Sequence, residues 1–536
     1  MATYDGILLG AGHNALVLQA YLARAGLRTL TLERAAQPGG GLATIENPRQ
    51  SGFLHNPHSF FHRAVTAMPW YRDLELEQAG ARYTEPELNV AVVFRDGRVL
   101  EWWSDLERTV TSVARFSRTD AATLLRWADE FRPIVEQLLV PEAQSPPLEP
   151  ARRRALLERT AAGRRLLQVS EASPLDFVLA EFEDDRVRAG LLFFNGLREV
   201  DLRLEGFGHA IPALLASPHK AQMCLGGSFE LARALVKDIE EHGGEVRCGA
   251  QIRRLVVRGG RVVGVELEGG ETVEASRFVA SGLNPQQTFL ELLPAEHAPP
   301  GLRERADGFR YNLLAPLFGL HLALDESPRY TAEANCPELA DAFMVVLGLE
   351  GVHTFRDMVD AHEAVTAPPL VAWGANPTRF DPSQAPAGKH TSFLWQKVPY
   401  GLAENDGDSH GARLLEFWRS YAPNLTDGNV LDRFVLTPRD TERTLPNMYR
   451  GDLLVGSFEA GQVGYARPFV GAGRYSTPLD GLYLCGGSTH PGGNITGLCG
   501  YNAASIIAKD VGLDPWWERR DIEASLLAAN DDEKFG

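Results

Sequence analysis

The first part of the chain has the hydrophobic pattern of a strand, a tight turn, a helix and a second strand. Tyr4–Leu9 is apolar enough for a buried strand, and the glycines of Gly10–Gly12 end it. His13–Ala25 has helical spacing and stops at Gly26, a residue that favours a helix C-cap, and Thr29–Glu33 predicts the next strand. Together these segments predict a βαβ unit.

Similar patterns along the rest of the chain predict two discontinuous domains. A hairpin is expected over Asn89–Trp103 with its turn at Asp96–Gly97, and residues 104–220 have mostly helical spacing. The last predicted strand, at 481–485, is followed by a glycine-rich loop and a helix at 495–509. We expect a nucleotide-binding domain from residues 1–75, 222–300 and 446–515, a substrate-binding domain from 76–221 and 301–445, and a C-terminal tail at 516–536.

Gly10-x-Gly12-x-x-Ala15 lies between the first strand and the helix, where a dinucleotide fingerprint has physical meaning. Gly10 permits the tight turn, Gly12 has no side chain to block a pyrophosphate, and Ala15 allows close packing of helix on strand. The phosphates would lie at the positive end of the helix beginning near His13. Glu33, at the end of the second strand, is placed to accept hydrogen bonds from a ribose and would repel a 2′-phosphate. The alternative is an ordinary glycine turn.

Two further glycine-rich segments favour FAD over a nicotinamide cofactor. Pro38–Gly41 brings a second glycine backbone close to the expected phosphate site, and residues 481–497 contain Gly486–Gly487 and Gly492–Gly493. A simple NAD dehydrogenase does not need such a loop so far along the chain, whereas the ribityl chain and ring system of FAD extend beyond the pyrophosphate.

The chain resembles the phytoene desaturase-like branch of FAD-dependent oxidoreductases. The matching segments are Gly10–Leu16, Glu33 with Gly39–Gly41 and Thr44, Asp381–Lys389, Pro438–Arg443, Arg467–Pro468 and Tyr475–Ala504. The resemblance implies an α/β protein with a Rossmann-like FAD-binding domain of the glutathione reductase/phytoene desaturase type and a discontinuous α+β substrate domain. It also implies non-covalent FAD and chemistry at C–H bonds of apolar molecules. Ala15 and Asn494 stand where the family often has glycine.

By the resemblance, the cofactor contacts come from both ends of the chain. Gly487 and Ser488 would lie beside the phosphates and ribityl hydroxyls, and Asn494 and Ile495 would present backbone N–H groups to the flavin at the start of the last helix. The full set of expected cofactor-binding residues is Gly10, Gly12, His13, Asn14, Ala15, Glu33, Arg34, Gly40, Gly41, Leu42, Ile252, Gly487, Ser488, Gly493, Asn494 and Ile495.

The candidates for a catalytic base are His58, His490 and Tyr501. His58 belongs to a cluster with His55 and His62, in a segment that the resemblance places near the flavin. The alternatives are that these imidazoles bind backbone or line a pocket passively, that His490 shapes its loop with Pro491, and that Tyr501 packs in the core. No metal ligands are expected.

Composition and charge exclude several classes of function. The net charge of −17 and a pI near 5.4 are unfavourable for nucleic acid or an anionic membrane surface as the main partner. Five scattered cysteines do not form the spacing of a disulfide framework, a zinc site or a dithiol redox centre. No stretch approaches the roughly 18 apolar residues of a membrane span. We therefore expect a cytoplasmic enzyme, with peripheral membrane contact left open.

These observations predict a dehydrogenase or desaturase that acts on a mostly apolar, alicyclic or isoprenoid-like substrate. Hydride would pass to flavin N5 and a proton to a base, and oxygen or a quinone would reoxidise the cofactor. Within enzymes, the alternatives are a flavin amine oxidase and a redox-neutral isomerase or saturase. A non-enzymatic alternative is a prenyl-binding protein like the GDP dissociation inhibitors, which keep the fold without flavin.

Overall fold

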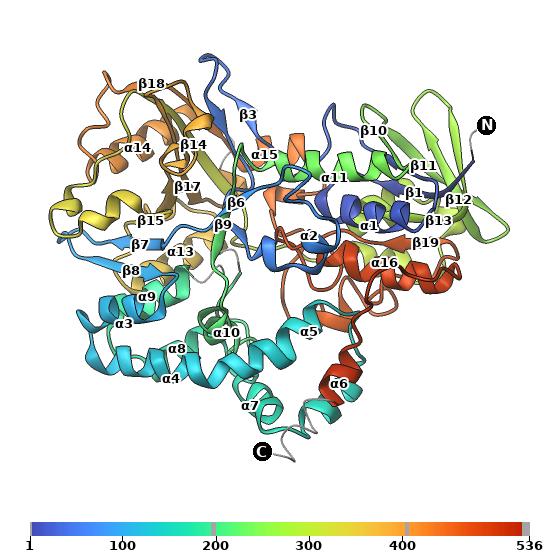
Figure 1. Ribbon diagram of the computed structural model, residues 1–536, viewed down its shortest axis with the longest axis horizontal. Coiled ribbons are helices and arrows are strands. Elements are labelled where there is room, and N and C mark those ends of the chain that lie inside the picture. The colour runs from blue at the N-terminus through green and yellow to red at the C-terminus, as the bar shows by residue number, and fades with distance from the viewer. Residues whose placement is uncertain (1–2, 195–199, 403–406, 528–536) are drawn as a thin grey trace.

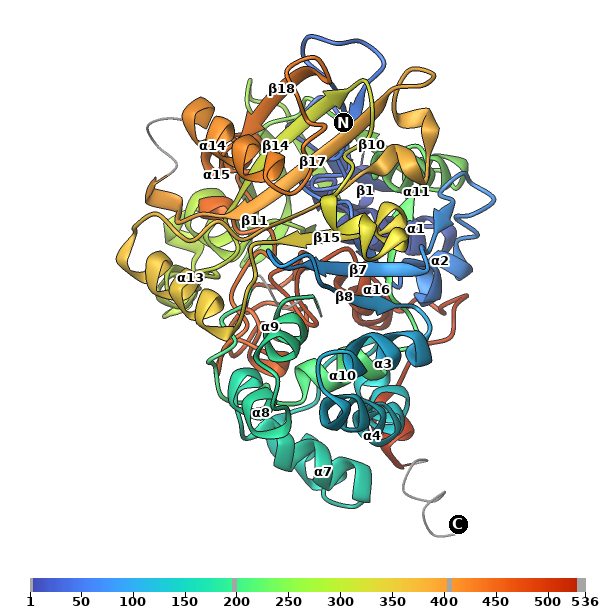
Figure 2. The same ribbon diagram turned by 90° about the vertical axis from the view of Figure 1, so that its left-hand side faces the viewer.

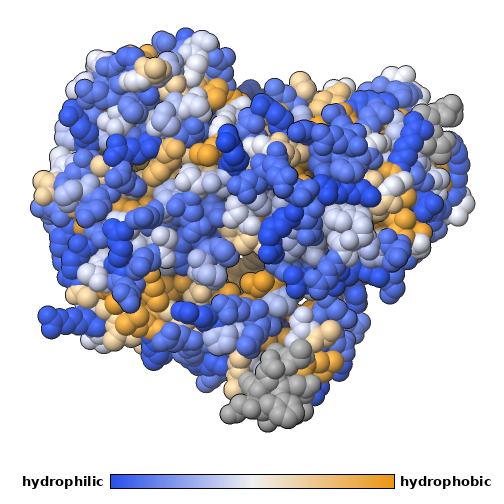
Figure 3. All heavy atoms as spheres, in the orientation of Figure 1, coloured by the Kyte–Doolittle hydropathy of each residue, from blue (hydrophilic) through white to orange (hydrophobic). Residues whose placement is uncertain are grey.

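The computed structural model describes residues 3–194, 200–402 and 407–527. Two seven-stranded sheets lie side by side, and a group of helices lies below them in the view of Figure 1. Figure 3 shows hydrophilic side chains over most of the same face, with apolar atoms at the bottom of a hollow near its centre. Within the described residues, no helix has the length and apolar character needed to cross a membrane.

The first sheet has a parallel centre with an antiparallel edge. Its strand order is β10-β2-β1-β13-β12-β11, and β19 also pairs with β13. The order brings together segments far apart in the chain, so the predicted βαβ unit forms only its middle. The strands are β1 (Thr3–Leu9), β2 (Thr29–Leu32), β10 (Glu245–Arg247), β11 (Ile252–Arg258), β12 (Arg261–Leu267), β13 (Thr272–Ser281) and β19 (Leu482–Leu484).

Three helices pack on this sheet: α1 (His13–Arg24), α11 (Phe229–Glu241) and α16 (Leu498–Asp510). The fully buried Leu16, Leu235 and Ile507 belong to their common core. Gly500 of α16 lies so close to α1 that a β-carbon there would be 1.8 Å from the carbonyl oxygen of Asn14. The close approach holds the last helix, and the loop before it, against the fingerprint helix.

The second sheet is mostly antiparallel, in the order β18-β14-β17-β16-β15-β7-β8 (Figure 2). Helix α14 (Gly407–Arg419) packs on one face through Leu414 and Trp418, and the aromatic residues Trp373, Phe393 and Trp395 lie on the other. The strands are β7 (Leu88–Val93), β8 (Val99–Trp103), β14 (Leu317–Leu324), β15 (Met344–Leu347), β16 (Ala372–Ala375), β17 (His390–Lys397) and β18 (Val430–Leu436).

A group of helices covers the aromatic face of the second sheet near strand β8 (Figure 2). The predicted helical character of residues 104–220 is confirmed, and the predicted hairpin turns at Gly97, which has a φ of +81°. The helices are α3 (Leu106–Ala114), α4 (Arg118–Ile134), α5 (Val140–Ala143), α6 (Pro150–Leu157), α7 (Ala161–Ser170), α8 (Pro174–Glu181), α9 (Asp185–Phe194), α10 (Ala210–Ala216) and, from the second sheet's own segment, α13 (Val352–Ala364).

Two boundaries differ from the sequence predictions. The last helix begins at Leu498 rather than at residue 495, because Gly497 adopts a φ of +65° that a continuing helix does not allow. The start of the predicted C-terminal tail is packed: Trp517 joins the core around Tyr21, and Ile522 and Leu526 are buried against the helices of residues 118–170. Apolar burial therefore fixes this segment as far as Leu526, whereas residues 528–536 lie outside the described part.

Candidate cofactor and substrate site

A cavity of about 490 Å³ runs along the fingerprint turn. Gly10 and Gly12 from the turn, Glu33 from the end of β2, Gly40 from the next glycine segment and Ile252 from β11 all line it. A main-chain bridge between Gly12 and Gly39 holds the two glycine segments together. The cavity is long enough in chain terms to contact both the expected ribose and phosphate positions, and its size is within the range of cofactor sites.

The residues present fit a dinucleotide cofactor. A β-carbon built on Gly12 would meet no atom within 4 Å, so the space above this glycine is open for a ligand. Two buried polar atoms, Asn14 Oδ1 and Ser488 Oγ, have no hydrogen-bond partner within the described structure. Buried polar groups are normally paired, so both atoms point to a ligand that supplies the missing partner. They come from opposite ends of the chain and meet at the same site.

Glu33 makes two contacts that sequence reasoning did not anticipate. Its Oε2 accepts the N–H of Ala11 at 2.8 Å, and its Oε1 accepts the N–H of Ala35 at 2.8 Å. The carboxylate therefore fixes the fingerprint turn itself and still has lone pairs for a ribose hydroxyl. Arg34 points elsewhere, since its guanidinium donates to the carbonyl oxygens of Arg443 and Thr444.

His13 joins the fingerprint to the C-terminal loop. Its Nε2 lies 3.0 Å from the carbonyl oxygen of Asn494, and burial lowers the pKa of the imidazole to about 4, so a neutral ring forms this hydrogen bond at neutral pH. Asn494 has a φ of +109°, a region that favours glycine, and its Oδ1 accepts the N–H of Ile495 at 2.9 Å. Neither detail was expected: Ile495 precedes the helix by three residues, and its N–H is already engaged.

Arg467 organises the rest of the C-terminal loop. Its side chain is fully buried and donates hydrogen bonds to main-chain carbonyl oxygens, among them those of Thr489 and Gly487 at 3.2 and 3.0 Å. Desolvation lowers the pKa of the guanidinium to about 10, so it stays charged at neutral pH. Sequence reasoning matched Arg467 to the family without giving it a role, and a buried arginine among glycine-rich segments is the signal that indicates one.

The other predicted cofactor residues divide between cavity and support. Gly41 lines a second cavity, described below, whereas Leu42 is fully buried in the core and Ala15 packs against Gly282, so both act as support. Gly493 also has a supporting role, since a β-carbon there would lie 2.0 Å from the carbonyl oxygen of Leu454. Sequence reasoning missed the segment 444–454, which lines both cavities and directly follows the family-like 438–443 segment.

A second cavity, of about 100 Å³, continues from the first. His58 lines both cavities, and the neighbours Gly40 and Gly41 line one each. Apolar side chains form most of the second wall: Phe60, Phe61, Val90, Leu317, Met344, Trp395, Met448, Leu453 and Leu454. Asn494 and Ile495 form the side that adjoins the C-terminal loop, so this cavity lies where the cofactor's reactive end is expected.

Of the three predicted catalytic residues, only His58 faces the cavities. Burial lowers the pKa of His58 to about 4, below the unperturbed value near 6.5, so its ring is neutral at neutral pH. His490 instead lies 2.9 Å, through Nε2, from the carbonyl oxygen of Glu142. Tyr501 packs edge-to-face on Tyr21 and donates to the carbonyl oxygen of Glu518. Neither His490 nor Tyr501 lines these two cavities, which argues against both as bases.

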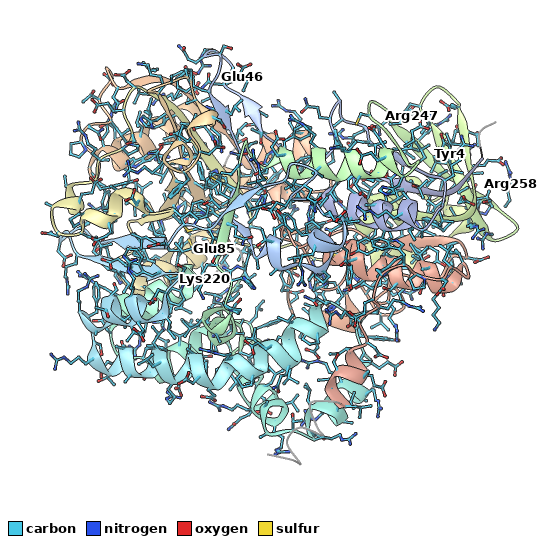
Figure 4. All side chains as sticks on the ribbon, in the orientation of Figure 1. Tyr4, Glu46, Glu85, Lys220, Arg247 and Arg258 are labelled. Atoms are coloured by element: carbon cyan, nitrogen blue, oxygen red, sulfur yellow. The ribbon has the colours of Figure 1, made fainter. Side chains whose placement is uncertain are left out.

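Charged groups gather where the second cavity meets strand β9 (Ala221–Cys224). Arg63 and Ala221 both line the cavity and pair in the β5–β9 ladder, where β5 is His62–Arg63. Lys220 and Glu85 lie beside this strand (Figure 4). Burial, with a smaller contribution from Arg63, lowers the pKa of Lys220 to about 8. The apolar cavity therefore has a basic edge.

Comparison with known proteins agrees with this geometry. The family model for flavin containing amine oxidoreductases matches residues 16–397. A limonene dehydrogenase polypeptide of Castellaniella defragrans is 31% identical over 539 residues, covering 96% of both chains. All-trans-zeta-carotene desaturase of Myxococcus xanthus is 24% identical, covering 95% of this chain and 94% of that protein.

The fold recurs in a solved structure. Cyclohexylamine oxidase from Brevibacterium oxydans superposes with a TM-score of 0.60 at 14% identity, covering 95% of this chain and all of that one. At this identity the likeness concerns the fold alone. The sequence-based resemblance to the phytoene desaturase-like branch and the expected α/β architecture are confirmed. The chain therefore belongs to the flavin containing amine oxidoreductase family and is an FAD-dependent oxidoreductase.

Proposed function

We propose that this enzyme dehydrogenates a compact, mostly apolar ring compound, forming a carbon–carbon double bond. The observation that carries the proposal is the second cavity, which is walled by apolar side chains and adjoins the C-terminal cofactor loop. When bound, FAD supplies a hydride acceptor, and oxygen or a quinone would take up its electrons afterwards. The protein's own residues exclude water, hold the substrate and accept the proton.

The size of the cavity supports a single ring over a long chain. Its volume of about 100 Å³ is smaller than an apolar cavity of roughly 150 Å³ that binds benzene. The rings of Phe61 and Trp395, whose centroids are 5.9 Å apart, fill the space on one side. A substrate must therefore either present one ring to the cofactor or displace these aromatic side chains.

The charge around the cavity disfavours the amine oxidase alternative. No carboxylate occurs among the described residues that line it, and Arg63 adds a positive charge at its edge. A protonated amine would be buried there without an anionic partner, which is costly. A neutral hydrocarbon or ketone meets no such penalty. The names of the limonene dehydrogenase and carotene desaturase relatives support a hydrocarbon-like substrate.

His58 remains the sequence-based proposal for the proton acceptor. It lies at the junction of the two cavities, within reach of a group that occupies either. Its low pKa keeps the ring neutral and able to accept a proton at neutral pH. We place the enzyme in the cytoplasm, and contact with a membrane surface would serve only to collect an apolar substrate.

Anaerobic incubation with four compounds tests the proposal. Limonene, cyclohexanone and cyclohexylamine carry one six-membered ring each, and all-trans-zeta-carotene represents a long polyene. Bleaching of the flavin absorption, with an unsaturated product, is expected for limonene or cyclohexanone and not for the other two. Fast reduction by cyclohexylamine would instead establish an amine oxidase, and unsaturated product from the carotene would refute the size argument.

A matched pair of variants locates the substrate. Leu317→Trp would fill the second cavity and is expected to slow flavin reduction at least tenfold without loosening FAD. Leu431→Trp, at a position of β18 that is 39% exposed, is the control for adding the same side chain outside the site. Equal rates in both variants would show that the substrate binds elsewhere.

A further inference from the structure

A buried chain of hydrogen bonds begins at the wall of the second cavity. Ser59 lines the cavity, and its Oγ lies 2.6 Å from Nε2 of His62. The other ring nitrogen, Nδ1, lies 2.9 Å from the hydroxyl of Tyr83, which is in turn hydrogen-bonded to the thiol of Cys224. His62 is fully buried, so these two contacts account for both of its nitrogens.

Two short strands hold this chain in place. His62 belongs to β5, and Tyr83 belongs to β6 (Tyr83–Thr84); both strands pair antiparallel with β9, where Tyr83 lies opposite Cys224. The hydroxyl of Ser228 donates to the carbonyl oxygen of Ser59, which fixes the other end. The spacing of serine, histidine and tyrosine is therefore set by main-chain pairing rather than by flexible side chains.

The arrangement differs from that of His58 in what happens after a proton is accepted. Protonated His62 would donate one N–H to Ser59 Oγ and the other to Tyr83 Oη, since both oxygens are already in position. The described residues offer His58 no hydrogen bond of this kind. Hydrogen bonding to the charged form favours it, so the protein can stabilise an imidazolium at His62 better than at His58.

We propose that Ser59 takes the proton from the substrate carbon and that His62, held by Tyr83, is the positioning residue that receives the proton of the Ser59 hydroxyl. The inference rests on the proposed dehydrogenation. As hydride leaves the neighbouring carbon, the electron pair of the broken C–H bond forms the double bond. Ser59 Oγ gains the substrate proton while its own proton moves to His62 Nε2, so the serine stays a hydroxyl and the histidine carries the charge.

The direction of the chain follows from this role. Ser59 must donate to Nε2, so Nδ1–H must donate to Tyr83 Oη, and the tyrosine O–H to the sulfur of Cys224. His13 is the other ionisable group that acts on His62, and burial keeps it neutral, with a pKa of about 4. It therefore brings no opposing charge at neutral pH.

Nitrogen NMR of the histidine rings tests the arrangement without any turnover. The His62 signals, identified by their loss in His62→Gln, are expected to show the neutral Nδ1–H tautomer in the FAD-free and the FAD-loaded protein. Tyr83→Phe removes the acceptor and should shift the ring towards the Nε2–H tautomer. An Nε2–H tautomer in the unaltered protein would reverse the chain and overturn the proposal.

Flavin reduction by limonene or cyclohexanone, whichever reduces the unaltered enzyme, tests the role. Ser59→Ala and His62→Gln should each slow it by about 10²–10⁴-fold, the usual share of a general base, and Tyr83→Phe by about tenfold. The exposed positions in Ser51→Ala and His297→Gln provide matched controls with unchanged rates. FAD affinity should stay within a few-fold in all variants.

Solvent isotope effects separate a relay from a structural role. In mixtures of light and heavy water, the reduction rate of the unaltered enzyme should depend on deuterium content in a curved manner, because two protons move together. Ser59→Ala should give a straight dependence, and this measurement remains available if His62→Gln fails to fold. A straight dependence in the unaltered enzyme, or a large rate loss confined to His58→Gln, would overturn the relay. If no compound reduces the flavin, the proposed function fails, while the NMR result still decides the chain.

Discussion

Replacing Glu33 with Gln removes a charge at the centre of the cofactor site while keeping the side chain's shape. In the structure the carboxylate accepts the N–H of Ala11 through one oxygen and that of Ala35 through the other, both at 2.8 Å. Glutamine has only one oxygen, so its NH₂ group must face one of these N–H donors. One hydrogen bond is lost outright, and the other loses its charge assistance.

The expected cost follows from these two contacts. Hydrogen bonds to charged groups contribute about 1.5–3 kcal/mol each, and neutral ones about 0.5–1.5 kcal/mol. Glu33 is half-buried, so solvent weakens both terms, and we expect a net loss of about 2 kcal/mol in the stability of the turn. FAD must bind to that turn and also loses a charged ribose partner, so its affinity should fall by about one to two orders of magnitude, at roughly 1.4 kcal/mol each.

Two measurements together test this reasoning. Titration of FAD into the FAD-free protein gives the affinity, and denaturant unfolding of the same FAD-free protein gives the stability. Glu240→Gln, at an exposed position of α11, is the matched control and should change neither. Looser FAD with unchanged FAD-free stability would mean that Glu33 acts on the ribose alone. If neither quantity changes, the account of Glu33 is refuted.

Three further predictions follow from buried polar groups. Ser488→Ala deletes a hydroxyl that has no protein partner, so FAD binding should weaken several-fold, whereas FAD-free stability, measured by denaturant unfolding, should not fall. Arg467→Met leaves several buried carbonyl oxygens unpaired, so unfolding measurements should show a loss of about 3–5 kcal/mol or no folded protein; wild-type stability would refute its role. Burial lowers the pKa of His55 to about 4, against about 6.5 unfolded, so the unfolded chain binds more protons between these values and stability falls as pH drops through this window. His55→Gln should flatten that decline by up to about 1.36 kcal/mol per pH unit in unfolding experiments at several pH values, and an unchanged slope would contradict this assignment.

The sequence by itself determined the elements that depend on local chemistry. Strand β1, the turn at Gly10 and helix α1 follow from apolar periodicity and from the need for φ of +83° at the turn, both of which are visible in the residues. The C-terminal loop is equally recognisable from its glycines. Its resemblance to known flavoproteins indicated FAD, because such loops approach a ligand through backbone atoms that glycine leaves exposed.

Tertiary structure decided which side chains face the site. Tyr501 and His490 have the chemistry of a base, yet helix packing against Tyr21 and a bond to the Glu142 carbonyl turn them away. The His62–Tyr83 contact depends on pairing with β9, some 140 residues further along the chain, and no local pattern records such pairing. Periodicity states that a residue is buried, but its partners are chosen by long-range contacts, and these determine whether a histidine is a pocket wall or part of a hydrogen-bond chain.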